Sequence, residues 1–426
     1  MIVPSIDMMG GQTVQLVGGE KKALEAGDPR PLARKFRVAG EIAVIDLDRA
    51  LGSGSNAEQI RELLAIAPCR VGGGIRDVDT AVEWLDRGAA KVILGTAARP
   101  EVLRELPRER VICALDAKDG EVVVEGWRKR TGATIEARMR ELRDFAGGFL
   151  VTFVEREGRM QGIDLERVRA VVAAADGAKV TVAGGVTTLE ELAAIDAMGA
   201  DAQVGMALYT GKIHLADGIV ASMSSDRSDG LWPTVVTDEQ GLALGLAYSN
   251  AESVRAAVDG GVGAYHSRKR GLWIKGESSG ATQELLRIDL DCDRDCLRFV
   301  VKQSEPGFCH RQTRTCWGDG DGLAALARKL GQRAREAPAG SYTRRLLDDP
   351  ELLRAKLIEE ARELAEANSQ GEVCAETADL IYFALVAMVR GEVDLVAVER
   401  ELERRSLRVT RRPGDAKPGA AEGPSQ

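Results

Sequence analysis

Three short motifs in the first half of this chain occur twice, and each pair is separated by nearly the same distance. SIDMMGGQTVQL (5–16) matches ALDAKDGEVVVE (114–125), VGGGIRDVDT (71–80) matches VAGGVTTLEE (182–191), and GTAA (95–98) matches GMAL (205–208). The shared offset of roughly 110 residues predicts two halves that fold in the same way. The alternative is chance similarity between glycine-rich turns, which would have to produce three matches at one offset.

Short apolar runs alternate with helical stretches through the same region. The runs are IAVIDL (42–47), KVILG (91–95), VICALD (111–116), FLVTFV (149–154) and KVTVAGG (179–185). Such runs are typical of strands buried on both faces of a parallel sheet. Stretches such as NAEQIRELLAIA and TTLEELAAIDAMGA between them have helical spacing. Over residues 1–223 this alternation predicts an α/β domain, most simply a (β/α)8 TIM barrel with a twofold half-barrel repeat.

Two aspartates occupy equivalent places in the two halves of the predicted barrel. Asp7 ends the first predicted strand and Asp116 ends the fifth. Functional residues of such barrels lie at the carboxyl ends of the strands, so these two would face each other across the mouth. A carboxylate pair suits general acid–base chemistry, in which one group donates a proton while the other removes one. The alternative is that each aspartate only caps the loop that follows it.

Glycine-rich turns follow the strands of each half. Backbone N–H groups in such turns can approach an anion closely, and the next helix N-terminus favours negative charge. The candidate phosphate-binding residues are Gly73, Gly74, Gly95 and Thr96 in the first half and Gly184, Gly185 and Gly205 in the second. Two phosphate sites on opposite sides of the mouth predict a substrate with a phosphate at each end.

Polar seams divide the rest of the chain. The linker SSDRSDG (224–230) follows the barrel, and GQRAREAPAGSY (331–342) separates a glycine-rich, strand-rich region from a strongly helical one. We expect domains at 1–223, 224–330 and 331–412. The first is the barrel, the second a small α+β zinc domain and the third all-α. The composition of residues 413–426 predicts a disordered tail.

The central region carries a dense set of metal-binding residue types. In the run DCDRD, Asp291, Asp293 and Asp295 would share one face if the run is extended, and three carboxylates suit Mg²⁺. Cys292 would point the other way, toward Cys309 and Cys316. Three thiolates leave one zinc position open, which is typical of a catalytic site. The alternative is a solvated acidic edge beside ordinary buried cysteines.

The helical region places carboxylates at spacings of three and four residues. The candidates for a second Mg²⁺ site are Glu359, Glu360 and Glu363 on one predicted helix and Glu376 and Asp379 on the next. These spacings put carboxylates on one helical face, and a cation between two such faces would relieve their repulsion. The alternative is a solvated acidic face.

Bulk composition limits the possible partners. The net charge is −8, which argues against nucleic acid as the main partner. The sequence contains neither an apolar run long enough to span a membrane nor a signal-peptide pattern at its start. Seven cysteines in 426 residues do not form a disulfide framework, so we expect a cytoplasmic protein.

Residues 1–223 resemble the histidine-biosynthesis barrel that isomerises ProFAR, a two-phosphate aminoimidazole carboxamide ribotide. The matching stretches are SIDMMGGQTVQLVGG, VIDLD, VGGGIR, ILGTAA, ALDAKDGEVVVEGW, TFVEREGRMQGID, AGGV and VGMALYTGK. The resemblance implies an Amadori rearrangement of an aminoaldose to an aminoketose. It also implies that Asp7 is the base at the sugar C2, Asp116 the acid that opens the ring, Thr152 a contact to the sugar, and Trp127 part of a loop that covers the substrate.

The stretch YHSRKRGLWIKGESSG (265–280), together with the cysteines and aspartates of 291–316, resembles phosphoribosyl-AMP cyclohydrolase. The resemblance implies hydrolytic opening of the adenine ring between N1 and C6 at a zinc site. It makes Arg268, Lys275 and Ser278 phosphate or ribose contacts and His310 a proton shuttle.

The pattern EExxE followed by ExxD, after SYT (341–343), resembles phosphoribosyl-ATP pyrophosphohydrolase. The implied reaction uses Mg²⁺ to bind the triphosphate. Both hydrolase families imply assembly as a homodimer, and the three implied reactions are consecutive steps of one pathway.

Several alternatives stay open. The barrel could be the sister imidazole glycerol phosphate cyclase, or an isomerase that also accepts phosphoribosylanthranilate. Gln15, Phe153 and Ala281 replace commoner family residues, so one domain could be a silent dimerisation scaffold. A regulatory protein that senses phosphoribosyl nucleotides is a further possibility.

Overall fold

A closed parallel barrel forms the N-terminal half of the computed structural model, which describes residues 1–19, 21–267, 269–336 and 340–411. Its strands, in chain order, are β1 (Ile2–Met9), β4 (Ile42–Asp46), β5 (Cys69–Gly72), β6 (Lys91–Leu94), β7 (Val111–Lys118), β10 (Gly148–Phe153), β11 (Lys179–Ala183) and β12 (Asp201–Val204). Neighbouring strands are parallel, and β10 pairs with β7 to close the ring. The predicted eight-stranded barrel is therefore confirmed, and the predicted tail at 413–426 lies outside the described residues.

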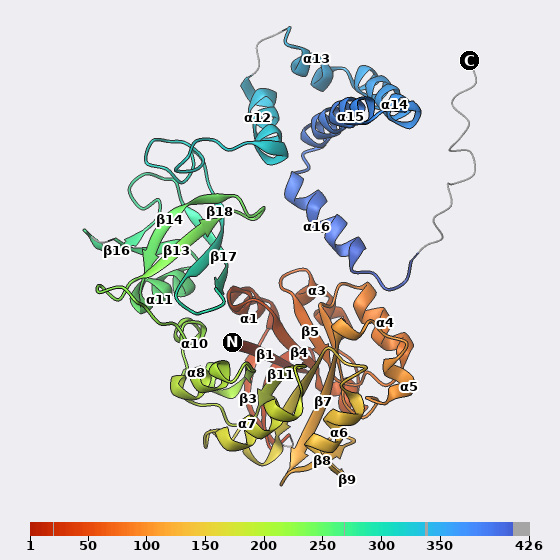
Figure 1. Cartoon of the computed structure of the whole chain (residues 1–426), viewed down its shortest axis with the longest axis vertical. Helices are drawn as coiled ribbons and strands as arrows, with labels where there is room; N and C mark the ends of the chain where they lie inside the picture. Colours follow the sequence, from red (N-terminus) through yellow and green to blue (C-terminus); the bar gives the residue numbers. More distant parts are fainter. Residues whose placement is uncertain (20, 268, 337–339, 412–426) are drawn as a thin grey trace.

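Helices surround the barrel, and most follow a strand directly (Figure 1). They are α1 (Pro29–Phe36), α2 (Leu47–Leu51), α3 (Ala57–Leu64), α4 (Val78–Asp86), α5 (Pro100–Leu103), α6 (Ile135–Leu142), α7 (Leu165–Ala174), α8 (Leu189–Ala197), α9 (Met206–Tyr209) and α10 (Leu215–Ile219). Their start signals are local: Thr188 and Glu191, for example, form a capping box at the start of α8. The apolar faces of the helices pack on strands that are buried on both sides, such as β10.

Two antiparallel excursions leave the barrel at equivalent strands. β1 continues into β2 (Gln12–Val17) and β3 (Lys21–Gly27), and β7 continues into β8 (Glu121–Val124) and β9 (Lys129–Thr134). Each excursion begins at the carboxyl end of its strand. Both therefore extend the wall of the barrel on the side where its mouth lies.

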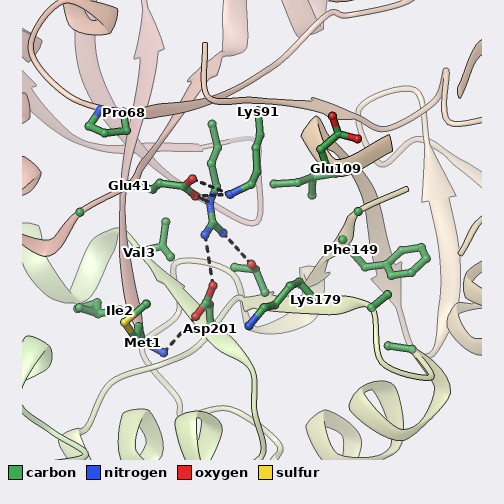
Figure 2. Close-up of a pocket in the computed structure, with 18 of the residues that line it drawn as sticks. Met1, Ile2, Val3, Glu41, Pro68, Lys91, Glu109, Phe149, Lys179 and Asp201 are labelled. Carbon is green, nitrogen blue, oxygen red and sulfur yellow. Dashed lines mark hydrogen bonds and ion pairs between the residues drawn. The ribbon is translucent and has the colours of Figure 1, made fainter. Parts of the chain in front are cut away.

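The opposite end of the barrel is closed by ion pairs. The Arg70 guanidinium binds the carboxylates of Glu41 and Asp201 and donates to Thr181, and Lys91 binds Glu41 at 2.6 Å (Figure 2). Burial favours the neutral form of Glu41, but Arg70 and Lys91 together hold its pKa below the ordinary value. A cavity of about 1020 Å³ lies beside this network, at the amino ends of the strands. This end of a β/α barrel usually contributes stability, so the smaller cavity at the mouth is the candidate active site.

The central region is a small sheet with one long helix. A four-stranded sheet has the order β14 (Ala243–Ser249), β13 (Trp232–Thr237), β18 (Leu297–Gln303), β17 (Gln283–Leu290). Helix α11 (Ala251–Gly260) and the hairpin of β15 (Ala264–Ser267) and β16 (Gly271–Ile274) complete the region. Tyr265, which is fully buried, packs against Phe299 and Trp273 to join the hairpin to the sheet.

The C-terminal region is helical, as the carboxylate spacing predicts. Its helices are α12 (Gly322–Glu336), α13 (Tyr342–Asp348), α14 (Pro350–Glu366), α15 (Gln370–Arg390) and α16 (Leu395–Ser406). Leu330 of α12, Leu346 of α13 and Phe383 of α15 share one apolar cluster, which is separate from the barrel core. No helix in the described ranges is long and apolar enough to cross a membrane.

The chain returns to the barrel after α16, which runs between the helical region and the barrel (Figure 1). The Asp86 carboxylate at the end of α4 accepts from the backbone N–H groups of Val409 and Thr410. The buried Arg110 guanidinium donates to the carbonyl of Leu407. The end of the helical region is therefore hydrogen-bonded directly to the barrel wall.

Candidate active sites

The mouth of the barrel holds a cavity of about 470 Å³ at the carboxyl ends of the strands. Asp7, Asp116 and Thr152 line it, on β1, β7 and β10. β1 and β7 are four strands apart in either direction around the ring, so the two aspartates come from opposite walls. The structure thus brings together the three residues that the sequence assigned to acid–base work and sugar binding.

Asp7 is enclosed by protein although its carboxylate faces the cavity. It accepts from Ser5 Oγ at 2.9 Å and from Gln15 Nε2 at 3.3 Å. Burial raises its pKa to about 6, and these two hydrogen bonds limit the rise. Gln15 is itself buried and serves here as a neutral donor to Asp7. At neutral pH the Asp7 carboxyl is mostly ionised and can accept a proton.

Asp116 lies beside Thr152 because the two residues are paired in register between β7 and β10. Burial raises the pKa of Asp116, and hydrogen bonds from Thr152 and Trp127 oppose the rise. Trp127 follows β8 with φ of +69°, and its ring packs against Gly19 of the other excursion. A Cβ added to Gly19 would lie 2.3 Å from that ring, so this close contact requires glycine. The two excursions therefore meet over the mouth.

A third carboxyl group, Glu157, also lines this cavity and was missed from the sequence. It follows the 3-10 turn η3 (Val154–Arg156) at the carboxyl end of β10. Burial, and then the negative charges of Asp7 and Asp116, raise its pKa to about 8. Its position five residues after Thr152 in TFVEREG could have identified it as a candidate site residue, because residues that follow a strand end lie near the mouth. Phe153, also in that run, instead packs in the core beneath Arg167.

The glycine turns divide between the mouth and its edge. Gly73, Gly74, Gly95, Thr96 and Gly205 line the cavity, whereas Gly184 and Gly185 are outside its lining. Both Gly73 and Gly184 lie too close to neighbouring backbone for a larger residue. A Cβ added to Gly73 would lie 2.3 Å from the Asp46 carbonyl oxygen, and one added to Gly184 would lie 2.6 Å from the Phe153 carbonyl oxygen. The two turns thus pack in the same manner in the two halves.

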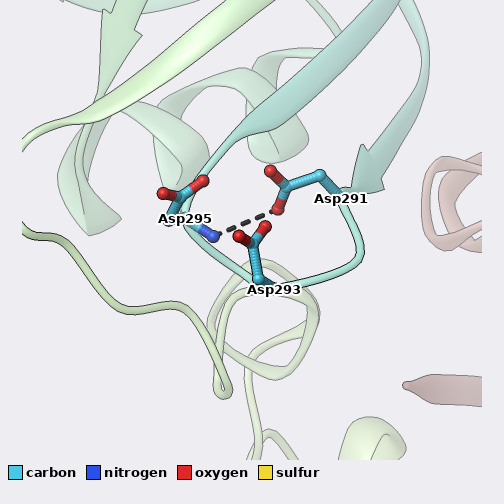
Figure 3. A group of neighbouring side chains, drawn as sticks. All are labelled: Asp291, Asp293 and Asp295. Atoms are coloured by element: carbon cyan, nitrogen blue, oxygen red, sulfur yellow. Dashed lines mark hydrogen bonds between the residues drawn. The ribbon is translucent and has the colours of Figure 1, made fainter.

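The three aspartates of DCDRD come together in the loop between β17 and β18 (Figure 3). Their nearest oxygens all lie within 4.8 Å of one another. The run is a tight turn rather than the extended strand considered from the sequence, and Arg294 within it has φ of +64°. The hydrogen bond to Asp291 and the charge of Asp293 raise the pKa of Asp295. Crowded carboxylates of this kind fit a hard divalent cation.

The thiols are only partly brought together. Cys309 and Cys316 interact with each other, and the backbone N–H of Arg311 lowers the pKa of Cys309. Cys292 is exposed beside Asp293, and no cluster of three thiols occurs within the described part of one chain. The exposed His310 lies 4.0 Å from Cys309 Sγ, measured from Nδ1.

The predicted phosphate contacts of this region differ in burial. Lys275 is buried near Cys309 and Cys316, over the ring of Phe308, and burial lowers its pKa. Ser278 is exposed in the turn that follows. Arg268 lies outside the described residues. Ala281 is buried under the sheet edge, where its backbone carbonyl accepts from Gln303.

The helical region gathers three of its five candidate carboxylates. Glu360 and Glu363 of α14 and Glu376 of α15 have oxygens within 4.8 Å of one another. Partial burial raises the pKa of Glu376, and the hydrogen bond to Glu363 and neighbouring charges raise it further. Glu359 and the exposed Asp379 are outside the group, and Lys356 pairs with both Glu359 at 2.9 Å and Glu360 at 2.7 Å. This oxygen-only set fits Mg²⁺.

The fold and these groups define a (β/α)8-barrel enzyme joined to two smaller domains that each carry a carboxylate cluster. The family model described as histidine biosynthesis protein matches residues 1–214. The models for phosphoribosyl-AMP cyclohydrolase and phosphoribosyl-ATP pyrophosphohydrolase match residues 245–318 and 323–406. The chain belongs to the histidine biosynthesis protein family and carries these two hydrolase domains after the barrel. Enzymes of both hydrolase families use divalent metal ions.

Curated relatives of this chain include multifunctional histidine biosynthesis proteins. A histidine biosynthesis trifunctional protein of Komagataella pastoris is 39% identical over 347 residues, 80% of this chain and 38% of its own length. A bifunctional protein of Schizosaccharomyces pombe is 53% identical over 206 residues, 48% of this chain and 49% of its own. An imidazole-4-carboxamide isomerase of Halobacterium salinarum is 41% identical over 233 residues, 52% of this chain and 96% of its own. The chain spans half or less of the two multifunctional relatives.

Proposed function

We propose that this chain catalyses three consecutive steps of histidine biosynthesis. Phosphoribosyl-ATP is hydrolysed to phosphoribosyl-AMP and pyrophosphate, the adenine ring of phosphoribosyl-AMP is opened by water to give ProFAR, and ProFAR is isomerised to its aminoketose. The observation that carries this proposal is the adjacency of three domains whose families act on successive products. Neither a sensor role nor a second substrate for the barrel has comparable support.

The barrel residues suit an Amadori rearrangement, which moves protons without net gain or loss of atoms. Asp116 donates a proton to the ring oxygen of the aminoaldose, so the bond from C1 to that oxygen breaks and the ring opens to a protonated imine. The ionised Asp7 then removes the proton from C2 to give an enaminol. Addition of a proton at C1 and loss of the proton of the C2 hydroxyl give the aminoketose. The opposite placement of the two carboxyls in one cavity supports this division of roles.

Glu157 and Trp127 support the same step. Because its pKa is about 8, Glu157 stays protonated at neutral pH and adds no charge beside the two aspartates. Trp127, which interacts with Asp116, lies where it can cover the reacting sugar. Gly73, Gly74, Gly95 and Thr96 would bind one phosphate, and the Gly184–Gly185 turn and Gly205 the other.

For the cyclohydrolase we assign the Mg²⁺ site to Asp291, Asp293 and Asp295 and the zinc site to Cys292, Cys309 and Cys316. Bound zinc would bring the pKa of a water molecule close to neutrality. His310, next to Cys309, is placed to move a proton between that water and the ring nitrogen. Lys275 and Ser278 would contact the phosphate or ribose, and the same role is proposed for Arg268.

For the pyrophosphohydrolase the Mg²⁺ ligands are Glu360, Glu363 and Glu376. Bound Mg²⁺ would neutralise the triphosphate charge. Glu359 and Asp379 border this set and would join it after a side-chain rearrangement. Lys356, which binds Glu359 and Glu360, holds the two glutamates in place.

We propose the domain boundaries at 1–223 and 224–321, followed by a helical domain that begins with α12. The predicted seam at residue 330 falls inside α12, and Leu326 and Leu330 of that helix belong to the apolar cluster of α13 and α15. The twofold half-barrel repeat is supported by the matching excursions after β1 and β7 and by the matching turns at Gly73 and Gly184.

We further propose a homodimer in the cytoplasm. Leu323 and Val373, each about half exposed, line an apolar groove of about 730 Å³ between α12 and α15. Cys292 stands apart from Cys309 and Cys316, so a second copy would complete the zinc site. The seven cysteines are free thiols, in keeping with a reducing compartment.

Purified protein supplied with phosphoribosyl-ATP, Mg²⁺ and Zn²⁺ tests the proposal, with products followed by chromatography and mass spectrometry. We expect release of pyrophosphate, then addition of one water, then an isomer of unchanged mass. Accumulation of ProFAR would contradict the isomerase assignment alone. Binding without any turnover would favour the sensor.

A further inference from the structure

The central residue of the DCDRD loop directs its charge away from the loop. Arg294 Nε and Nη2 bind the two carboxylate oxygens of Asp196 at 2.8 and 3.0 Å. Asp196 belongs to α8 of the barrel, almost a hundred residues earlier in the chain. A lone guanidinium in a turn with three aspartates would be expected to pair with them, but here it forms its ion pair with an aspartate of the barrel domain.

Arg294 is held by its backbone carbonyl as well as by its guanidinium. Its carbonyl accepts from the backbone N–H of Ser224 in the linker at 2.8 Å, and its Nη1 donates to the carbonyl of Asp291. The Asp291 carboxylate in turn accepts from the backbone N–H groups of Asp295 and Cys296, both at 3.1 Å. The turn that gathers the three carboxylates is therefore tied to the barrel through one side chain.

The backbone at Arg294 supports the same conclusion. Its φ of +64° lies in the left-handed region, which favours glycine over a long side chain. The Asp196 side chain is only 9% exposed, so its carboxylate is largely shielded from water and depends on its ion pairs. Burial would raise the pKa of Asp196, but the hydrogen bonds from Arg294 and from the Met1 amino group hold it well below its usual range.

We propose that Arg294 is a positioning residue, through which α8 of the barrel sets the geometry of the cyclohydrolase carboxylate site. With its guanidinium committed to Asp196, the charge of the three aspartates is left for a divalent cation. The barrel then serves the neighbouring reaction as a scaffold as well as catalysing its own. This inference rests on the proposed function, since it takes the three aspartates as metal ligands.

Mn²⁺ binding to the full chain tests the inference, because Mn²⁺ prefers the same oxygen ligands as Mg²⁺ and its free form is measured by electron paramagnetic resonance. A Glu363→Gln background removes the helical site from the titration. In that background we expect Arg294→Gly to weaken Mn²⁺ binding about tenfold, since residues that orient metal ligands typically contribute 10- to 100-fold. Arg294→Gly also relieves the left-handed backbone, so its effect is not one of strain.

Four further variants separate positioning from general loss of stability. Asp196→Asn should weaken Mn²⁺ binding as much as Arg294→Gly does, the double variant should be no worse, and Arg294→Lys should be intermediate. Arg255→Ala is the matched control, because Arg255 of α11 pairs with Asp217 of α10 across the same domain boundary but away from the loop. It should leave Mn²⁺ affinity unchanged.

The outcomes distinguish this inference from the proposed function. If Arg294→Gly and Asp196→Asn bind Mn²⁺ with the same affinity as the Glu363→Gln background, this inference alone is overturned. An equal loss in Arg255→Ala would overturn it too, because the effect would be one of domain docking. No Mn²⁺ bound in the Glu363→Gln background would contradict the metal role of the three aspartates, and the inference with it.

Discussion

The barrel mouth and the α14–α15 pair each crowd three carboxyl groups together, but only the first set is enclosed by protein. Asp7, Asp116 and Glu157 line a cavity between barrel walls, and burial is the largest cause of each raised pKa. In the second group Glu360 is buried, but Glu376 is only partly buried and Glu363 is exposed, so the group opens to the surface of the two helices. Enclosed carboxyls relieve their repulsion by keeping protons, whereas exposed ones attract a cation.

The difference matches the two kinds of chemistry. Proton transfers at a sugar need carboxyls whose pKa lies near neutral pH, which burial supplies. Hydrolysis of a triphosphate needs neutralisation of phosphate charge, which a divalent cation supplies. The predictions below test whether the two regions really divide their roles in this way.

The largest effect is expected for Asp7→Asn, which replaces the base by a group that cannot accept the C2 proton. Isomerisation should fall by about a thousandfold, within the range found for general bases. Exchange of the C2 hydrogen in D₂O measures the step directly. Both hydrolytic steps should proceed as before, and Asp28→Asn, at an exposed site of the same barrel, should have no effect on isomerisation.

A smaller loss is expected for Glu363→Gln. Pyrophosphate release should fall about a hundredfold, because one oxygen of the three-carboxylate group becomes a weak ligand. The comparison is Glu359→Gln, which alters a carboxylate that is paired with Lys356 outside the group. An equal loss in both variants would show that the α14 face acts as a whole and that no defined site exists.

The pH dependence of isomerisation should be bell-shaped. Asp7 acts ionised, so activity rises as pH passes about 6, and Glu157 acts protonated, so activity falls as pH passes about 8. One unit beyond either limb costs about tenfold. In Glu157→Gln the limb near pH 8 should be lost while the acid limb remains, and the alkaline limit should pass to Asp116, which has to be protonated to act as the acid. A limb that stays at pH 8 in this variant would assign it to a group other than Glu157.

The smallest effect concerns stability. The pKa of Glu157 in the folded protein, about 8, lies above its ordinary value of 4.5. The stabilisation that its protonation contributes is therefore fully present below about 4.5 and is lost as pH rises through 8. At pH 9 the free energy of unfolding of Glu157→Gln should therefore exceed that of the parent by on the order of a few kcal/mol, with a smaller gain at pH 6. The variant should accordingly unfold at a higher temperature in a thermal melt. Glu190→Gln, on an exposed helix face, should behave like the parent at both values.

The sequence predicts most of the barrel and much less of its mouth. Periodicity and the repeated motifs were sufficient for the eight strands and for the opposed aspartates, because strand ends in a parallel barrel meet at one face. Glu157 was missed because it lies beyond β10, directly after a 3-10 turn, where no alternation indicates which way a side chain points.

The carboxylate groups show the same limit. Spacing along α14 and α15 predicted five acidic candidates, but the packing of the two helices decides which three converge. The contact of Arg294 with Asp196 joins residues of two domains, and neither flanking sequence contains a pattern that indicates it. Contacts between distant elements depend on packing that local sequence does not encode.

Removal of divalent metal tests the division between the two regions most directly. The full chain is stripped with a chelator and then supplied separately with ProFAR and with phosphoribosyl-ATP. We predict that the metal-free protein converts ProFAR to the aminoketose at the rate of the untreated protein, while phosphoribosyl-ATP stays intact until Mg²⁺ is restored. Loss of isomerisation on chelation, or pyrophosphate release without metal, would contradict this account.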